Sequence, residues 1–446
     1  MTPLKKHASN LHFSEQSTII QSMARIFGLL FLIFPMLVRG EIFQLRIDGP
    51  IDSIMEEYVV GSLKTCQGNP RTKLIIIQID TPGGFDTSMR SIIKEMVNSP
   101  VPIAVFVSPK GARAASAGFF IAIAADYAAM TPDTNMGAAH PVSVTGTDIE
   151  KTMKEKITND AASYIKSLAK NRNRNSEWAE KAVRESLSYT AEDCLKNQLI
   201  DFIAADIEDL VRKIEAQTKR LVDGKLTPSG LAGEKIISIE MSARQKFLKT
   251  ITNPNLAYFL LIFGLIGLYI EFTHPGVIFP GILGGISLFL AFLAFQILPI
   301  NYVGLGLILL SIGLFIAEIK IQGFGLLGVG GIIAFVLGSV ILVNSPIPEM
   351  RPTMSVIGVF ALCFGSVFLF LTFKVLKAMK RKSASGPEGI IGEKGTAKTD
   401  IDAIGGKVFL HGEWWNALSD QPIPAGSKIQ VENILNLVLT VKSIGG

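Results

Sequence analysis

The sequence is poor in charged residues, cysteines and histidines, and each shortage excludes a class of protein. Charged side chains make up 18% of the 446 residues, below the roughly 25% of soluble chains, and the net charge of +5 gives no basic footprint for nucleic acid. Three cysteines do not form an even disulfide framework. Five histidines are scattered without the spacing of metal ligands. We therefore expect no metal, no cofactor and no nucleic-acid partner.

The shortage of charge is concentrated in one long region. Between Lys249 and Lys374 the charged residues are Glu271, Glu318, Lys320, Glu349 and Arg351. Such a region predicts membrane-spanning helices, because a charged side chain is costly in lipid. We expect a transmembrane region over 251–376. Its apolar runs predict about five spans, near 256–272, 277–298, 302–319, 323–343 and 354–373.

The apolar region contains an internal repeat with a period of 47 residues, which aligns Glu271 with Glu318 and Gly281 with Gly328. Glycines at such positions let helices approach closely in lipid. The run GFGLLG over 323–328 has the form of a dinucleotide-binding fingerprint. No soluble βαβ unit follows it, so we interpret it as helix packing.

Residues 1–40 predict an export signal, preceded by an extra polar segment. Arg25 is followed by an apolar run over 26–38, and Val38 and Gly40 suit the small-residue cleavage pattern. The run is short for a spanning helix, which favours a signal over an anchor.

Basic residues cluster after the last apolar span, at Lys374, Lys377, Lys380, Arg381 and Lys382. This cluster predicts that the C-terminal end is cytoplasmic. With five spans, residues 41–250 lie on the other side. The expected protein is therefore an integral inner-membrane protein with an extracytoplasmic N-terminal domain.

Residues 41–216 alternate strand-like and helix-like patterns. The runs 74–79 and 102–107 are continuously apolar, which predicts parallel strands covered on both faces. We expect an α/β domain here, followed by a linker over 217–250. Residues 387–446 read as short alternating strands punctuated by glycine, typical of a small barrel. Asn436 suits a left-handed turn between the last two strands.

The barrel gives no sign of a nucleic-acid surface. It carries seven acidic residues against five lysines. We interpret it as an assembly or protein-contact module.

Ser116 is the candidate nucleophile, in the stretch GARAASAGFFIAIAAD over 111–126. The simpler interpretation is a serine that caps a helix among small residues that permit close packing. The glycine turn DTPGG over 80–84 and the start of the helix at Ala117 favour a second interpretation, because their backbone N–H groups can receive an oxyanion. A serine nucleophile needs a base. The residues leave the choice open among His140, Lys151, Lys154 and Lys156.

The order of the segments IDTPGG, AASAG and KITN resembles the NfeD family of membrane serine peptidases, related to the Clp protease and crotonase fold and to signal peptide peptidase A. The resemblance covers essentially the whole chain after the signal. It implies a ClpP/crotonase-like domain over 41–216, a helical transmembrane bundle and an OB-type barrel. It implies a dyad of Ser116 and Lys156, with Gly84 and Ala117 as the oxyanion hole. His140 is the alternative base, since Clp proteases carry a catalytic histidine near this place.

The predicted function is that of a membrane-bound serine endopeptidase that cleaves apolar segments of membrane-associated proteins. The resemblance implies stomatin- or prohibitin-like partners, and we expect a homo-oligomer. Phe119 and Phe120, just after Ser116, suggest an apolar substrate along the site. One alternative is a membrane scaffold with little or no proteolysis that organises a stomatin- or flotillin-like partner. A second alternative, an acyl-CoA enzyme of the crotonase type, is disfavoured by an extracytoplasmic site without CoA.

Overall fold

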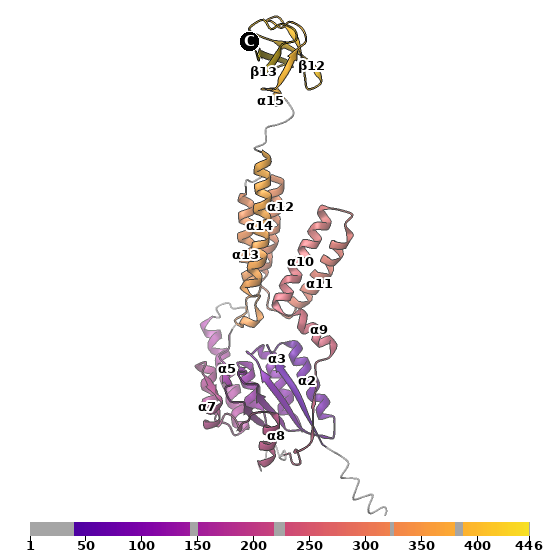
Figure 1. Ribbon diagram of the computed structural model, residues 1–446. Helices are drawn as coiled ribbons and strands as arrows, with labels where there is room; N and C mark the ends of the chain where they lie inside the picture. Colours follow the sequence, from indigo (N-terminus) through magenta and orange to yellow (C-terminus); the bar gives the residue numbers. More distant parts are fainter. Residues whose placement is uncertain (1–39, 143–149, 218–227, 322–324, 380–386, 446) are drawn as a thin grey trace, which may run out of the picture. The chain divides into compact units, whose positions relative to one another are not determined.

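The structure is a computed structural model that describes residues 40–142, 150–217, 228–321, 325–379 and 387–445 (Figure 1). Apart from Gly40, the expected export signal lies outside the described residues. The chain divides into two compact units, residues 1–311 with 333–359, and residues 312–332 with 360–446. Each unit is described by itself.

The N-terminal domain is built on a six-stranded sheet in which all strand pairs are parallel. The strand order is β8-β5-β3-β2-β1-β9. The strands are β1 (Glu41–Asp48), β2 (Thr72–Asp80), β3 (Ile103–Val107), β5 (Tyr127–Met130), β8 (Phe202–Ile203) and β9 (Lys235–Ser238).

Helices cover both faces of this sheet. The strand residues Ile75, Ile77 and Ile79 belong to one buried cluster, together with residues of α2 (Ser53–Gln67), α3 (Asp86–Val97) and α4 (Ala117–Ala124). Leu74 and Ile76 point the other way, into a second cluster with α8 (Ile207–Ala216). Burial on both faces explains why these strands are continuously apolar.

A second, three-stranded sheet lies beside the first. It has the order β4-β6-β7 and consists of β4 (Arg113–Ala115), β6 (Asn135–Gly137) and β7 (Ser188–Thr190). A bridge between Thr81 and Ala114 joins it to the turn after β2. The remaining helices of the domain are α5 (Lys151–Asn171), α6 (Ser176–Arg184) and α7 (Ala191–Lys196).

The expectation of a plain linker over 217–250 is wrong for its second half. Residues 235–238 form β9, which pairs in parallel with β1 and completes the edge of the sheet. Helix α9 (Ala243–Ile251) follows, with a capping box at Ser242, and the Lys249 ammonium donates to the Asp48 carbonyl oxygen at 2.7 Å. A four-residue strand is too short to stand out as a pattern.

Five apolar helices follow: α10 (Pro254–Thr273), α11 (Ile278–Phe295), α12 (Tyr302–Ile321), α13 (Leu326–Leu342) and α14 (Met354–Met379). They lie close to the five expected runs. Among the described residues, three segments are long and apolar enough to cross a membrane, namely 254–273, 278–295 and 348–374. The apolar stretches 302–318 and 326–342 are shorter. In the α10–α11 hairpin, a Cβ on Gly284 would lie 2.9 Å from the Gly264 carbonyl oxygen, so glycine is what allows the close approach.

The C-terminal region is a closed five-stranded barrel with the order β10-β11-β12-β14-β13. After α15 (Pro387–Ile390), its strands are β10 (Lys394–Ala397), β11 (Gly406–Leu410), β12 (Glu413–Leu418), β13 (Lys428–Leu435) and β14 (Val438–Ser443). It has its own buried apolar cluster. The expected sequence of an α/β domain, apolar helices and a small barrel is thus confirmed.

Candidate active site

Ser116 lies at the turn between β4 and α4, in a conformation that few residues adopt. Its φ is 53° and its ψ is −116°. Its N–H donates to the Gly137 carbonyl oxygen at 2.9 Å. Ser116 occupies the N-cap position of α4, but its side chain makes no capping hydrogen bond. Simple capping therefore does not explain this serine, and such strain is typical of functional sites. A strained serine at a strand-to-helix turn is the arrangement that presents a nucleophile.

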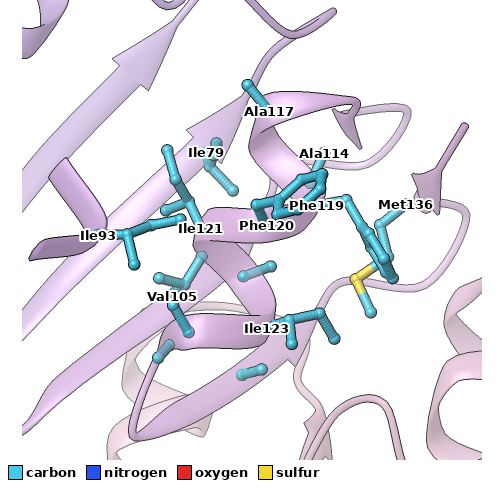
Figure 2. Packing of buried hydrophobic residues seen from close by; sticks show 14 of the residues in the cluster. Ile79, Ile93, Val105, Ala114, Ala117, Phe119, Phe120, Ile121, Ile123 and Met136 are labelled. Atoms are coloured by element: carbon cyan, nitrogen blue, oxygen red, sulfur yellow. The ribbon is translucent and has the colours of Figure 1, made fainter. Parts of the chain in front are cut away.

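The helix that carries Ser116 is embedded in the core. Every residue of α4 is buried. In Figure 2, Ile121 lies toward Ile79, Ile93 and Val105, and Phe119 lies toward Met136. This packing fixes the direction of the helix and holds the turn at Ser116 in place.

Small residues around Ser116 allow two loops to meet. A Cβ on Gly83 would lie 2.6 Å from the Ser116 Cβ and 3.1 Å from its Oγ, and the φ of Gly83 is 112°. A Cβ on Gly118 would lie 2.4 Å from the Thr81 Cγ2. Contacts this short leave no room for a side chain. The glycine turn after β2 therefore packs directly against the serine.

Two backbone N–H groups belong to residues next to this contact, Gly84 after Gly83 and Ala117 after Ser116. The Ile51 N–H donates to the Gly83 carbonyl oxygen and the Phe85 N–H donates to the Ile51 carbonyl oxygen, each at 2.9 Å. Because successive residues of an extended segment point in opposite directions, the N–H of Gly84 faces away from Ile51. It makes no hydrogen bond within the described residues. Ala117 is the first residue of α4, so its N–H has no acceptor within the helix.

Two buried arginines hold the far end of α4. The Arg172 Nε donates to the Ala124 carbonyl oxygen at 2.9 Å, and the Arg174 guanidinium donates to the carbonyl oxygens of Ile123 and Ala125 at 2.8 and 2.7 Å. Each arginine also pairs with a carboxylate, Asp126 at 3.1 Å and Asp201 at 2.8 Å. Cations at a helix C-terminus satisfy its free carbonyls and oppose the helix dipole.

Sequence reasoning missed this arginine clamp. The run NRNRN over 171–175 reads as a polar turn, although both arginine side chains are at most 5% exposed. Two arginines just after a long predicted helix are visible in the sequence. The sequence does not show that their side chains bind the end of α4.

Lys156 lies on the exposed N-terminal part of α5. It shares a helix face with Asp160 and Tyr164, four and eight residues further on. Asp160 pairs with Arg90 of α3 at 2.5 Å, and the Tyr164 ring stacks on Phe120 of α4 at 6.0 Å. This face is therefore turned toward α3 and α4. Lys156 lies roughly 12 Å along the helix from Tyr164. Among the described residues, Lys156 makes no hydrogen bond with Ser116.

His140 lies three residues after β6, whose Gly137 accepts from Ser116. Its Nδ1 is 3.0 Å from the Val183 carbonyl oxygen. A carbonyl oxygen only accepts, so Nδ1 is the donor in this contact. No hydrogen bond joins His140 to Ser116 within the described residues. Lys151 and Lys154 are also exposed on α5.

The suggestion that Phe119 and Phe120 face a substrate is wrong. They are 0% and 5% exposed and belong to the core, because the helix after Ser116 runs inward. Cys66 and Cys194 are both free and buried, so they do not pair. Burial raises the pKa of the Cys66 thiol to about 11, and it also raises the pKa of the Cys194 thiol. Neither is suited to act as a nucleophile. The described residues contain no group of three or more His, Cys, Asp or Glu side chains arranged to hold a metal ion.

A parallel α/β domain with a strained serine at a helix start, joined to apolar helices, has the features of a membrane-bound serine hydrolase. Three family descriptions match the chain: "NfeD1b, N-terminal domain" over 41–220, "NfeD integral membrane domain" over 255–374 and "NfeD-like C-terminal, partner-binding domain" over 387–442. The membrane-bound protease PH1510 of Pyrococcus horikoshii is 33% identical over 425 residues, covering 93% of this chain and 96% of that protein. The membrane protein NfeD1b of Bacillus subtilis is 30% identical over 265 residues, or 58% of each chain.

The chain therefore belongs to the NfeD family and is a membrane-bound serine peptidase. Two solved structures are also similar. Both are described as the 1510-N membrane-bound stomatin-specific protease, one a serine-to-alanine variant and the other a lysine-to-alanine variant in complex with a substrate peptide. They are 32% and 30% identical, cover 46% and 48% of this chain and 99% of their own chains, and have TM-scores of 0.42 and 0.44.

Proposed function

We propose that this protein cleaves apolar segments of membrane-associated, stomatin-like proteins with a dyad of Ser116 and Lys156. The strained, uncapped Ser116 beside two backbone donors carries the proposal. A catalytic serine needs a hydroxyl that no capping hydrogen bond occupies, and backbone N–H groups that can donate to the oxyanion of the intermediate. The uncapped side chain of Ser116 and the N–H groups of Gly84 and Ala117, which are free within the described residues, support this role.

The proposed reaction has two halves, and Lys156 acts first as a base and then as an acid in each. Neutral Lys156 takes the proton of the Ser116 hydroxyl as Oγ attacks the substrate carbonyl carbon. The N–H groups of Gly84 and Ala117 donate to the oxyanion of the tetrahedral intermediate. The Lys156 ammonium then protonates the leaving amine. In the second half, Lys156 takes a proton from water as the water oxygen attacks the acyl-enzyme carbonyl carbon. The Lys156 ammonium then returns this proton to Ser116 Oγ as the acyl–oxygen bond breaks, which releases the acid and restores the free serine and the neutral amine.

Lys156 can act as a base only when its surroundings lower its affinity for a proton. It is exposed in this structure, so we propose that the bound substrate covers it. Met153 and Ile157 lie on the same part of α5 and are 50% and 38% exposed. Exposed apolar side chains beside a lysine suit an apolar segment better than a polar one. Burial of the ammonium under that segment favours the neutral amine.

The test is a serine-directed fluorophosphonate probe with a peptidase assay on the full-length protein in detergent. Ser116→Ala is expected to abolish labelling. Ser116→Ala and Lys156→Ala are each expected to lower kcat/KM by about 10³-fold or more. Lys154→Ala, two residues away on the same exposed turn, is the matched control and should change it less than threefold. Loss of activity in His140→Ala with retention in Lys156→Ala would assign the base to His140.

The pH profile separates the two bases independently. A lysine base predicts activity that rises toward alkaline pH, with a midpoint below the free-lysine value of about 10.4. A histidine base predicts a midpoint near 6.5, since that is roughly the free imidazole pKa.

We also propose that the peptidase domain is extracytoplasmic and the barrel, of the OB type, cytoplasmic. The proposal holds whether five helices cross the membrane or only the three long segments, because both counts are odd. Asp133 in the peptidase domain and Ile404 in the barrel are exposed, and each is replaced by cysteine in turn. An impermeant thiol reagent on intact spheroplasts should label the first and reach the second only after permeabilisation. Labelling of both from outside would mean that one of α12 and α13 does not cross.

The second candidate function is a membrane scaffold, favoured by the match of residues 387–442 to a partner-binding domain. Ser116→Ala in cells distinguishes the two. A scaffold predicts that a stomatin-like partner keeps its membrane distribution in this variant. A peptidase predicts that the partner accumulates uncleaved.

A further inference from the structure

The barrel exposes an apolar patch where two hairpins end. Phe409 and Trp414 are paired across the β11–β12 hairpin, with their rings 6.1 Å apart, and Trp414 is 61% exposed. Leu435 ends β13 and Leu437 lies in the turn before β14, and they are 71% and 72% exposed. We call these four residues the hairpin patch.

The strand register brings the two hairpin ends together. Strands β12 and β14 run parallel with Asn416 opposite Val438. The turn before Val438 therefore lies beside the beginning of β12, where Trp414 is placed. Ile404, which is 94% exposed, precedes β11 at the opposite end of the β11–β12 ladder, where Gly406 pairs with Ala417.

Leu437 has two unfavourable features in the isolated protein. Its φ is 65°, a left-handed conformation that glycine and asparagine adopt readily and leucine does not. Its side chain is also exposed to solvent. A turn of this kind ordinarily places glycine at this position, after an asparagine such as Asn436. A leucine here is stabilised when another molecule covers it.

The closed barrel restricts how a partner binds. Its five strands pair in a ring, so it offers no free strand edge to which a partner could add a strand. Recognition must then use side chains. The barrel carries seven acidic residues and five lysines, a net charge of −2 from residues 387–446. An acidic module is repelled by the anionic lipid surface, which favours a protein over a membrane as the occupant.

We propose that the hairpin patch is the surface by which the barrel docks an apolar segment of its protein partner. This inference rests on the proposed function for the existence of a stomatin-like partner and adds the surface and its chemistry. A few residues near the centre of an interface supply most of the binding energy, and tryptophan is prominent among them, so Trp414 is the expected anchor of the patch. The segment that fits is apolar, with basic residues at its margin opposite the acidic barrel.

The experiment measures binding of the purified stomatin-like protein of the same organism to the full-length protein in nanodiscs. The double variant Trp414→Ser/Leu437→Asn is expected to weaken Kd at least tenfold. Asparagine suits the left-handed backbone at 437, so this substitution does not threaten the fold. The matched control Ile404→Ser removes a still more exposed apolar side chain at the far end and should change Kd less than twofold. Hydrolysis of a short reporter peptide should stay unchanged in both variants.

Several results would overturn the proposal. These are an equal effect of the control and the double variant, no binding by the unsubstituted protein, or variants that lose only self-association. A further measurement uses anionic phospholipid vesicles, and patch-dependent vesicle binding with partner binding intact would assign the patch to lipid instead. Ser116→Ala separates this inference from the proposed function, because it should abolish hydrolysis and leave Kd unchanged.

Discussion

The peptidase domain and the barrel each contain a non-glycine residue with positive φ at a proposed functional position, and the two residues differ in how far they are buried. Ser116, at φ 53°, is half-buried and is followed by a helix that is buried throughout. Leu437, at φ 65°, is 72% exposed on a hairpin turn. The first residue is held by the glycine turn and the buried helix next to it, and the second lies in a turn between two paired strands.

The difference shows that a strained backbone conformation can serve either catalysis or the binding of a partner. A conformation that costs of order 1–3 kcal/mol persists only where the surroundings enforce it. Around Ser116 the enforcement comes from the glycine turn, the core and the arginine clamp, which hold the backbone of the turn in place. Around Leu437 the enforcement is local, so a partner can supply the missing contacts.

The largest effect is expected for Arg174→Met. The substitution removes two hydrogen bonds to the end of α4 and the ion pair with Asp201. Breaking a buried ion pair by removing one partner costs about 3–5 kcal/mol. We expect a lower thermal midpoint for the peptidase domain. Arg184→Met, which removes an exposed pair with Glu180, is the control and should cost at most about 1 kcal/mol. Equal midpoints for the two variants would show that the clamp does not hold α4.

The next effect is expected for Gly83→Ala. A methyl group there would lie 2.6 Å from the Ser116 Cβ, so the serine or the glycine turn must move. A displacement of about 1 Å can cost roughly 10²-fold in rate. We therefore expect kcat/KM to fall by at least that factor, with a smaller loss of stability. Gly61→Ala is the control, since a Cβ at Gly61 in α2 meets nothing within 4 Å and should stabilise the helix by about 0.5–1 kcal/mol. Full activity in Gly83→Ala would show that the close contact is dispensable.

The sequence predicts those features that depend on residues close together in the chain. The continuous apolar runs predict the parallel strands, and the small residues around Ser116 predict the close approach that Gly83 makes. Asn436 predicts the left-handed turn, and its φ is 48°. The arginine clamp, strand β9 and the burial of Phe119 and Phe120 were not predicted. Each depends on which distant segment lies alongside, and a polar run such as NRNRN looks the same whether it faces water or a helix end.

The same limit applies to the catalytic base. Spacing alone leaves His140 and the lysines of α5 equivalent. The choice of Lys156 depends on resemblance, and the described residues do not bring it into a hydrogen bond with Ser116. The structure adds that the face of α5 that carries Lys156 also carries Tyr164, whose ring stacks on Phe120 of α4. It also shows that His140 Nδ1 is hydrogen-bonded to the Val183 carbonyl oxygen.

The smallest effect is expected for glycine substitutions at Leu437 and Leu435. They should change the stability of the β13–β14 hairpin in opposite directions. Leu437→Gly removes the side chain from a left-handed position, so it should stabilise the β13–β14 hairpin by about 1 kcal/mol. Leu435→Gly removes an equally exposed side chain at the end of β13, where φ is not positive. The added backbone freedom should there destabilise the hairpin by about 0.5–1 kcal/mol. Amide hydrogen exchange of β13 and β14 in the full-length protein measures both changes locally. Protection that falls in both variants would mean that Leu437 already has its stabilising contacts within the chain, and the reason for assigning it to a partner would be lost.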